Sequence, residues 1–82
     1  MTREPEWSRE EFAVLLASSE IDAAELAKTD LPSRSPDAIK VVRQGILMLD
    51  GGKDTHGILS RMMVQFLEKR PRLLAWAADQ FR

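Results

Sequence analysis

The amino-acid sequence predicts a small all-α protein that forms a single domain over residues 1–82. Every strong boundary signal in the chain is a helix cap, and apolar residues recur three and four positions apart, as they do on one face of a helix. No stretch alternates apolar and polar residues for long enough to predict a β-strand. The 82 residues include no cysteine, so the expected core is thin and is held by packing alone.

The first predicted helix begins after Ser8. Ser8 and Glu11 have the spacing of a capping box, and Trp7 and Phe12 have the spacing of a hydrophobic staple across the same helix start. A tryptophan at a staple position in so small a fold is expected to belong to the core or the cap rather than to a binding surface. The predicted helix covers residues 9–17 and buries Phe12, Leu15 and Leu16.

The second predicted helix is short and follows the same pattern. Asp22 is expected to cap it and Glu25 to close a second capping box. The helix should cover residues 23–28 and end before Pro32, because a proline disfavours helical geometry in the residue that precedes it.

The third predicted helix has the clearest start. Ser35 is a typical cap, Pro36 suits the first helical position, and Asp37 lies at the positive end of the helix dipole. The helix should continue to about Leu49 with one apolar stripe, made of Ile39, Val42, Ile46 and Leu49. The opposite face then carries Asp37, Lys40, Val41, Gln44 and Met48, with Arg43 on the flank.

Residues 50–57 are predicted to form a loop and residues 58–82 a helical C-terminal segment. In the loop, Gly51 or Gly52 suits the left-handed conformation that often ends a helix. Pro71 interrupts the helical pattern of the segment that follows, so either two helices or one helix kinked near Arg70 is expected there.

Three segments that occur in order resemble the Myb/SANT-like family in its bacterial or phage form. They are WSREEF at residues 7–12, the Leu26-Ala27 pair, and LPSRSPDAIK at residues 31–40. The resemblance covers about residues 7–49 and implies a three-helix helix-turn-helix unit. The stretch from Trp7 to the second predicted helix is shorter than in the Myb repeats, and aliphatic residues stand where that family has its later tryptophans.

The resemblance implies that the third helix enters the major groove of double-stranded DNA. Base contacts would then come from Asp37, Lys40, Val41 and Gln44, and phosphate contacts from Arg34, Ser35, Arg43 and Lys53. The residue types suit these roles, because glutamine can bond adenine, lysine can reach guanine, and valine can contact a thymine methyl group. The alternative is an ordinary solvated helix face, since charged residues opposite an apolar stripe are common.

The charge is distributed unevenly along the chain. Residues 1–31 contain three basic and eight acidic side chains, for a net charge of −5, whereas residues 32–82 contain nine basic and five acidic ones, for +4. Such an asymmetry would orient a weak encounter with DNA. The sequence therefore predicts a sequence-specific DNA-binding protein, and specifically a small regulator of transcription.

The alternative function is a protein-interaction module that does not touch DNA. The apolar stripe of the C-terminal segment is longer than a unit of residues 7–49 can easily cover, so a homodimer or another protein partner is possible. The candidate interface residues are Met63, Phe66, Leu73, Trp76 and Phe81.

Other functions are not supported by the sequence. Asp50, Asp54 and His56 share one loop but are expected to form a solvated turn rather than a metal site. The segment 51–55 lacks the spacing of a phosphate-binding loop. We therefore expect no enzyme activity, no cofactor and no metal. With no apolar run long enough for a membrane span or a secretion signal, we also expect a cytoplasmic location.

Overall fold

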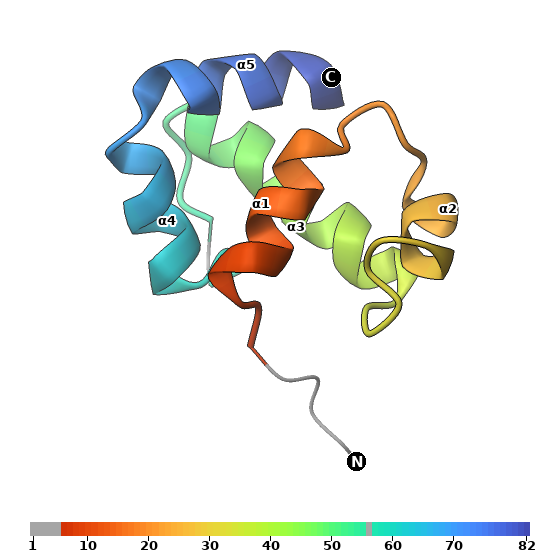
Figure 1. Cartoon of the computed structure of the whole chain (residues 1–82). Helices are drawn as coiled ribbons and strands as arrows, with labels where there is room; N and C mark the ends of the chain where they lie inside the picture. Colours follow the sequence, from red (N-terminus) through yellow and green to blue (C-terminus); the bar gives the residue numbers. More distant parts are fainter. Residues whose placement is uncertain (1–5, 56) are drawn as a thin grey trace.

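The computed structural model describes residues 6–55 and 57–82, and within them the chain forms five helices and no strand (Figure 1). The helices are α1 (Arg9–Ala17), α2 (Ala23–Lys28), α3 (Pro36–Asp50), α4 (Arg61–Glu68) and α5 (Pro71–Phe81). The predicted all-α class is confirmed, and the bounds of the first three helices agree with the prediction to within a residue. The C-terminal segment forms two helices rather than one kinked helix, because Pro71 begins a helix of its own.

Side-chain caps start α1 and α3 as the sequence predicts. The Glu11 amide donates to Ser8 Oγ and the Ser8 amide donates to Glu11 Oε1, both over 3.1 Å, which completes the capping box. At the start of α3, Ser35 Oγ accepts a hydrogen bond from the Ala38 amide. The prediction of a second capping box is wrong, because the Asp22 side chain makes no hydrogen bond to the start of α2. The Asp22 carboxylate is instead close enough to Arg43 to raise the pKa of Arg43.

All five helices contribute to one core, and α3 lies at its centre. Figure 1 shows α5 running along one edge of the molecule and α4 and α2 at opposite ends. The largest fully buried side chains are Phe12, Leu15, Leu26, Ile39, Ile46, Met63 and Leu67. The C-terminal segment is therefore part of the same hydrophobic cluster as residues 7–49 rather than a support added to a separate unit.

Two glycines have structural roles. Gly45 is buried where α3 meets the segment before α4, and a Cβ at this position would lie 2.8 Å from Ile58 and 2.9 Å from Leu59. The absence of a side chain thus allows that segment to lie directly against α3. Past the end of α3, Gly52 has a φ of 74°, which is the left-handed conformation. The sequence had predicted this conformation for either Gly51 or Gly52.

Candidate nucleic-acid interface

One face of α3 is exposed along most of the helix. Asp37, Lys40, Val41 and Gln44 are all exposed, and Val41 exposes 49% of its surface, an unusual value for a large apolar residue in this fold. The opposite face supplies buried core residues, so the helical period places these four side chains together on the solvent side. The sequence predicted this grouping, and the structure brings the four residues together as expected.

Ser35 and Lys53 lie near opposite ends of α3. Ser35 is exposed, and its Oγ accepts from Ala38, which leaves its hydroxyl proton free to donate. Lys53 is also exposed, and its amide donates to the Met48 carbonyl over 2.9 Å at the C-terminal end of α3. Both side chains are accessible to a phosphate group.

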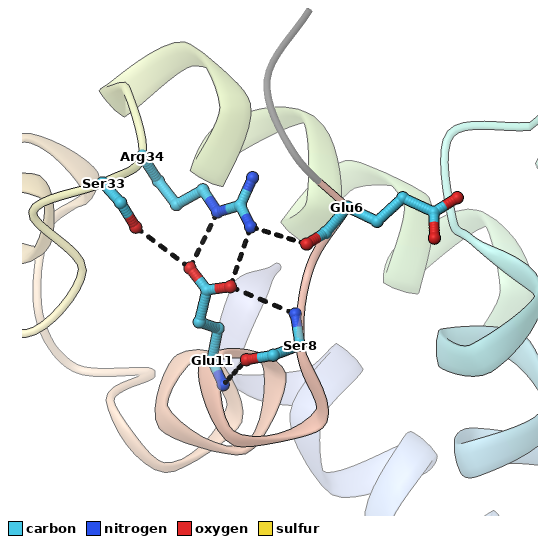
Figure 2. A network of polar contacts seen from close by, with 5 residues as sticks. All are labelled: Glu6, Ser8, Glu11, Ser33 and Arg34. Atoms are coloured by element: carbon cyan, nitrogen blue, oxygen red, sulfur yellow. Dashed lines mark hydrogen bonds and ion pairs between the residues drawn. The ribbon is translucent and has the colours of Figure 1, made fainter.

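Arg34 was predicted to contact phosphate, and the structure shows that it is not accessible for this role (Figure 2). It exposes only 4% of its surface. Its Nε donates to Glu11 Oε2 over 2.9 Å, and its Nη2 donates to Glu11 Oε1 over 2.8 Å and to the Glu6 carbonyl over 3.0 Å. The guanidinium also lies 4.8 Å from the centre of the Trp7 ring. Arg34 therefore ties the connection between α2 and α3 to the start of α1.

Glu11 holds several parts of this network at once. Its Oε1 accepts from the Ser8 amide and its Oε2 from the Ser33 hydroxyl, in addition to the two bonds from Arg34 (Figure 2). The hydrogen bond from Arg34 is the main reason that the pKa of Glu11 is lowered to about 2, against the opposing effect of burial. We call Glu6, Ser8, Glu11, Ser33 and Arg34 the N-terminal clamp.

Arg43, the other arginine predicted to contact phosphate, is also directed inward. Its Nη2 donates to the carbonyls of Ser18 over 3.2 Å and Ile21 over 2.7 Å, and its guanidinium lies 5.1 Å from the centre of the Phe81 ring. Its Nε is buried and has no hydrogen-bond partner among the described residues, and desolvation lowers the pKa of Arg43. Because Ser18 is the C-cap of α1, the cation stabilises the negative end of that helix dipole.

The predicted C-terminal interface is mostly internal. Met63 exposes 1% of its surface and belongs to the core, so the prediction that it lies at an interface is wrong. Phe66 packs edge-on against Phe12, with ring centres 5.7 Å apart, and Phe66, Leu73 and Phe81 are half-buried. Only Trp76 is well exposed, at 46%. It lines an apolar groove of about 190 Å³ together with Ala13, Leu16, Ala17, Phe66 and Leu73.

A cation-rich groove was not predicted from the sequence. It has a volume of about 370 Å³ and lies between the start of α1 and α4. Its basic side chains are Arg9, Arg61, Lys69 and Arg70. The spacing of four between Arg61, Gln65 and Lys69 could have indicated a polar face on α4, but only the fold brings Arg9 to the same place.

Residues 6–55 and 57–82 contain no group of three or more metal-ligating side chains, and no helix among them has the length and apolar character needed to cross a membrane. His56, which the sequence analysis assigned to a solvated turn, lies outside the described residues. Comparisons of the chain with protein-family models, curated proteins and solved structures gave no significant match.

Proposed function

We propose that the chain binds double-stranded DNA and that the exposed face of α3 contacts base edges in the major groove. The observation that carries this proposal is the grouping of Asp37, Lys40, Val41 and Gln44 on one solvent-facing side of a long helix whose other side is fixed in the core. In this role the protein would act in the cytoplasm as a small regulator of transcription.

The support for α3 suits recognition by a rigid helix. Its 15 residues extend over about 22 Å, enough for a helix to follow the major groove over several base pairs. Its Ser35 cap, its contact with α2 and its contact with α5 fix the helix in place. Side chains on a fixed helix lose little additional entropy when they bind, which favours selective base contacts.

The loss of two predicted phosphate contacts changes the expected strength of binding. With Arg34 and Arg43 directed inward, Lys40 on α3 and Lys53 just beyond its end are the two predicted DNA-contacting cations that remain exposed. Two neutralised phosphates give a slope of about −1.8 for log K against log salt, in place of about −3.6 for four. The α3 face by itself is thus expected to bind DNA weakly at physiological salt.

The test is to select a preferred duplex from a random pool at low salt and then to compare variants on it. Gln44→Ala and Lys40→Ala should each weaken binding to the preferred duplex by about 1–3 kcal/mol, and weaken binding to random DNA much less. Gln80→Ala, which removes an exposed glutamine from α5, is the matched control and should have no effect. The proposal would be refuted if Gln44→Ala and Lys40→Ala bound the preferred duplex as tightly as the Gln80→Ala control, or if the parent protein bound no DNA at low salt.

The second candidate function is contact with another protein through the apolar groove beside Trp76. The specific observation in its favour is the 46% exposure of this tryptophan next to Ala13 and Ala17 of α1, two small side chains that leave the groove open. Aromatic residues in such positions are often central to protein contacts. Self-association is the form that can be measured directly.

For this candidate, sedimentation of the parent protein should show a dimer at high concentration, and Trp76→Glu should weaken it. Gln80→Glu introduces the same charge elsewhere on α5 and serves as the control. A monomer at every concentration would remove the homodimer from consideration.

A further inference from the structure

The cation-rich groove and the apolar groove adjoin each other, because Phe66 lines both of them. Along α1 the two grooves are lined in turn by Arg9, Ala13 and Ala17. These three residues are spaced four positions apart, so they share one side of the helix. The two grooves therefore follow the same side of α1, with the cations near its start and the apolar part toward its end. We call the two together the composite groove.

The cations of the composite groove are available to a ligand. Arg9, Arg61 and Lys69 are exposed, and their side chains make no ion pair or hydrogen bond within the described part of the chain. Arg70 donates from one guanidinium nitrogen to the Phe66 carbonyl over 3.2 Å, which leaves its other donors available. No acidic side chain lines the cation-rich part, so positive charge is concentrated there in a protein whose net charge is −1.

The apolar part of the composite groove has the opposite character. None of the described residues that line it is charged, and the indole N–H of Trp76 is the one polar side-chain group among them. Trp76 is nevertheless 46% exposed. The volume of this part, about 190 Å³, is below the roughly 300 Å³ at which small-molecule pockets begin. It suits an apolar side chain of a larger partner better than a separate small molecule.

A polypeptide segment fits this combination of surfaces better than a nucleic acid does. Carboxylates can pair with the guanidinium groups in a bidentate geometry, and an apolar side chain beside Trp76 leaves no polar group unpaired. A nucleic-acid base in the same place would lose hydrogen bonds at its polar edges, because the lining offers it almost no partners. The Phe66 ring is not free for base stacking either, since the Arg70 guanidinium lies 4.1 Å from its centre.

We propose that the composite groove binds an acidic segment of a protein partner, with carboxylates at its cation-rich part and a large apolar side chain in its apolar part. This inference rests on the second candidate function, which it deepens by naming the chemistry of the partner, and it does not depend on DNA binding by α3. Arg9 and Ala17 are eight residues apart, so the α1 side of the groove extends over about 12 Å. About four residues of extended peptide, or two turns of helix, span that length.

The probe is a displayed library of random peptides of about a dozen residues. Selection on the immobilised full chain at low salt should enrich sequences that combine aspartate or glutamate with a large apolar residue, relative to the unselected library. The most enriched peptide is then synthesised with a fluorescent label, and fluorescence polarisation measures its affinity for the parent protein and for variants.

The variants test the two parts of the composite groove separately. Trp76→Ala should weaken binding of the peptide at least about thirtyfold, as expected for an aromatic residue at the centre of a contact. Arg61→Gln combined with Lys69→Gln should weaken it about tenfold at low salt, because two exposed ion pairs are lost. High salt should reduce the second effect by screening and leave the first almost unchanged.

Matched controls use exposed residues outside the lining of either groove. Gln80→Ala is the control for Trp76→Ala on the same helix, and Arg72→Gln combined with Lys28→Gln removes the same number of charges as the groove variant. Neither control should change the affinity for the peptide. Circular dichroism checks that each variant retains the helical content of the parent.

The outcomes distinguish this inference from the second candidate function. Enriched peptides without an excess of acidic residues, or an affinity that neither groove variant changes, would overturn the inference. A parent dimer that Trp76→Glu weakens, together with a selection that enriches no peptide, would assign the groove to a second copy of the chain, which overturns the inference and leaves the second candidate function intact. A parent that stays monomeric and enriches no peptide overturns both. Displacement of the peptide by single-stranded oligothymidylate, with binding of the oligonucleotide lost in both groove variants, would assign the groove to a nucleic acid and likewise overturn the inference.

Discussion

Three arginines of this protein lie over an aromatic ring, and the two at the corners, Arg34 and Arg70, differ most in their surroundings. Arg34 lies over Trp7, is almost completely buried, and has both oxygens of the Glu11 carboxylate as partners. Arg70 lies over Phe66, is exposed, and within the described part of the chain donates only to the Phe66 backbone carbonyl. The ring contact is similar in the two cases. Burial and a charged partner make the first arginine structural, whereas exposure leaves the second available to a ligand.

The largest expected difference between the corners is in stability. Arg34→Met should lower the free energy of unfolding by about 3 kcal/mol, the low end of the range for breaking a buried ion pair, because the Glu11 side chain is 24% exposed and keeps its bonds from Ser8 and Ser33. Denaturant unfolding measures this loss. A loss of that size is a large part of the stability expected for so short a chain, so partial unfolding in plain buffer also agrees with the prediction. A change of less than about 0.5 kcal/mol would show that the N-terminal clamp is not structural.

The pH dependence of stability should also distinguish Arg34, which pairs with Glu11, from Arg70. The folded state lowers the pKa of Glu11 from 4.5 to about 2, so the clamp should contribute fully above about pH 4.5 and be lost as the pH falls toward 2. Unfolding of the parent protein and of Glu11→Gln, measured between pH 6 and pH 2.5, should show a stability gap that narrows with acid. A stability difference that stays constant over this pH range would contradict the lowered pKa of Glu11 in the folded state. Arg70→Gln should not alter the narrowing, because Arg70 is not a partner of Glu11.

Arg43 is intermediate between Arg34 and Arg70, so it tests whether burial or a charged partner determines the cost of replacing an arginine. It is half-buried like a structural residue, but its partners are two carbonyls and the Phe81 ring rather than a carboxylate. Arg43→Met should cost about 2 kcal/mol, between the values for the two corners, since charge-assisted hydrogen bonds are lost without leaving an unpaired charge. A loss as large as that of Arg34→Met would show that burial alone, rather than the charged partner, determines the cost.

Arg70→Met should have the smallest effect on stability, about 0.5–1 kcal/mol, which is typical of an exposed contact between a cation and an aromatic ring. Urea unfolding of this variant beside Arg34→Met gives the comparison directly. A loss above 2 kcal/mol would mean that Arg70 is needed to hold the α4–α5 corner, and would argue against its availability to a ligand in the cation-rich groove.

The sequence by itself predicted the helices well, because helix signals are local. The Ser8–Glu11 box, the Ser35 cap and the stripe through Ile39, Val42 and Ile46 all depend on residues within a few positions of one another. For the same reason the exposed face of α3 was predicted correctly, with Lys40 and Gln44 opposite the buried stripe. The failed box at Asp22 shows the limit of such signals, since a tertiary neighbour, Arg43, lies within electrostatic reach of the carboxylate.

The accessibility of the charged and aromatic residues depends on contacts between distant parts of the chain. Arg34 contacts the Glu11 carboxylate, 23 positions earlier in the chain, and Arg43 contacts two carbonyls that lie 22 and 25 positions earlier. Arg9 of α1 lines the same cation-rich groove as residues of α4. Gly45 permits the close approach of Ile58 and Leu59, which no local pattern indicates. The identity of the residue alone does not show whether an arginine lies at the surface or is buried. What separates them is whether folding brings a partner close enough to offset the cost of removing the charge from water.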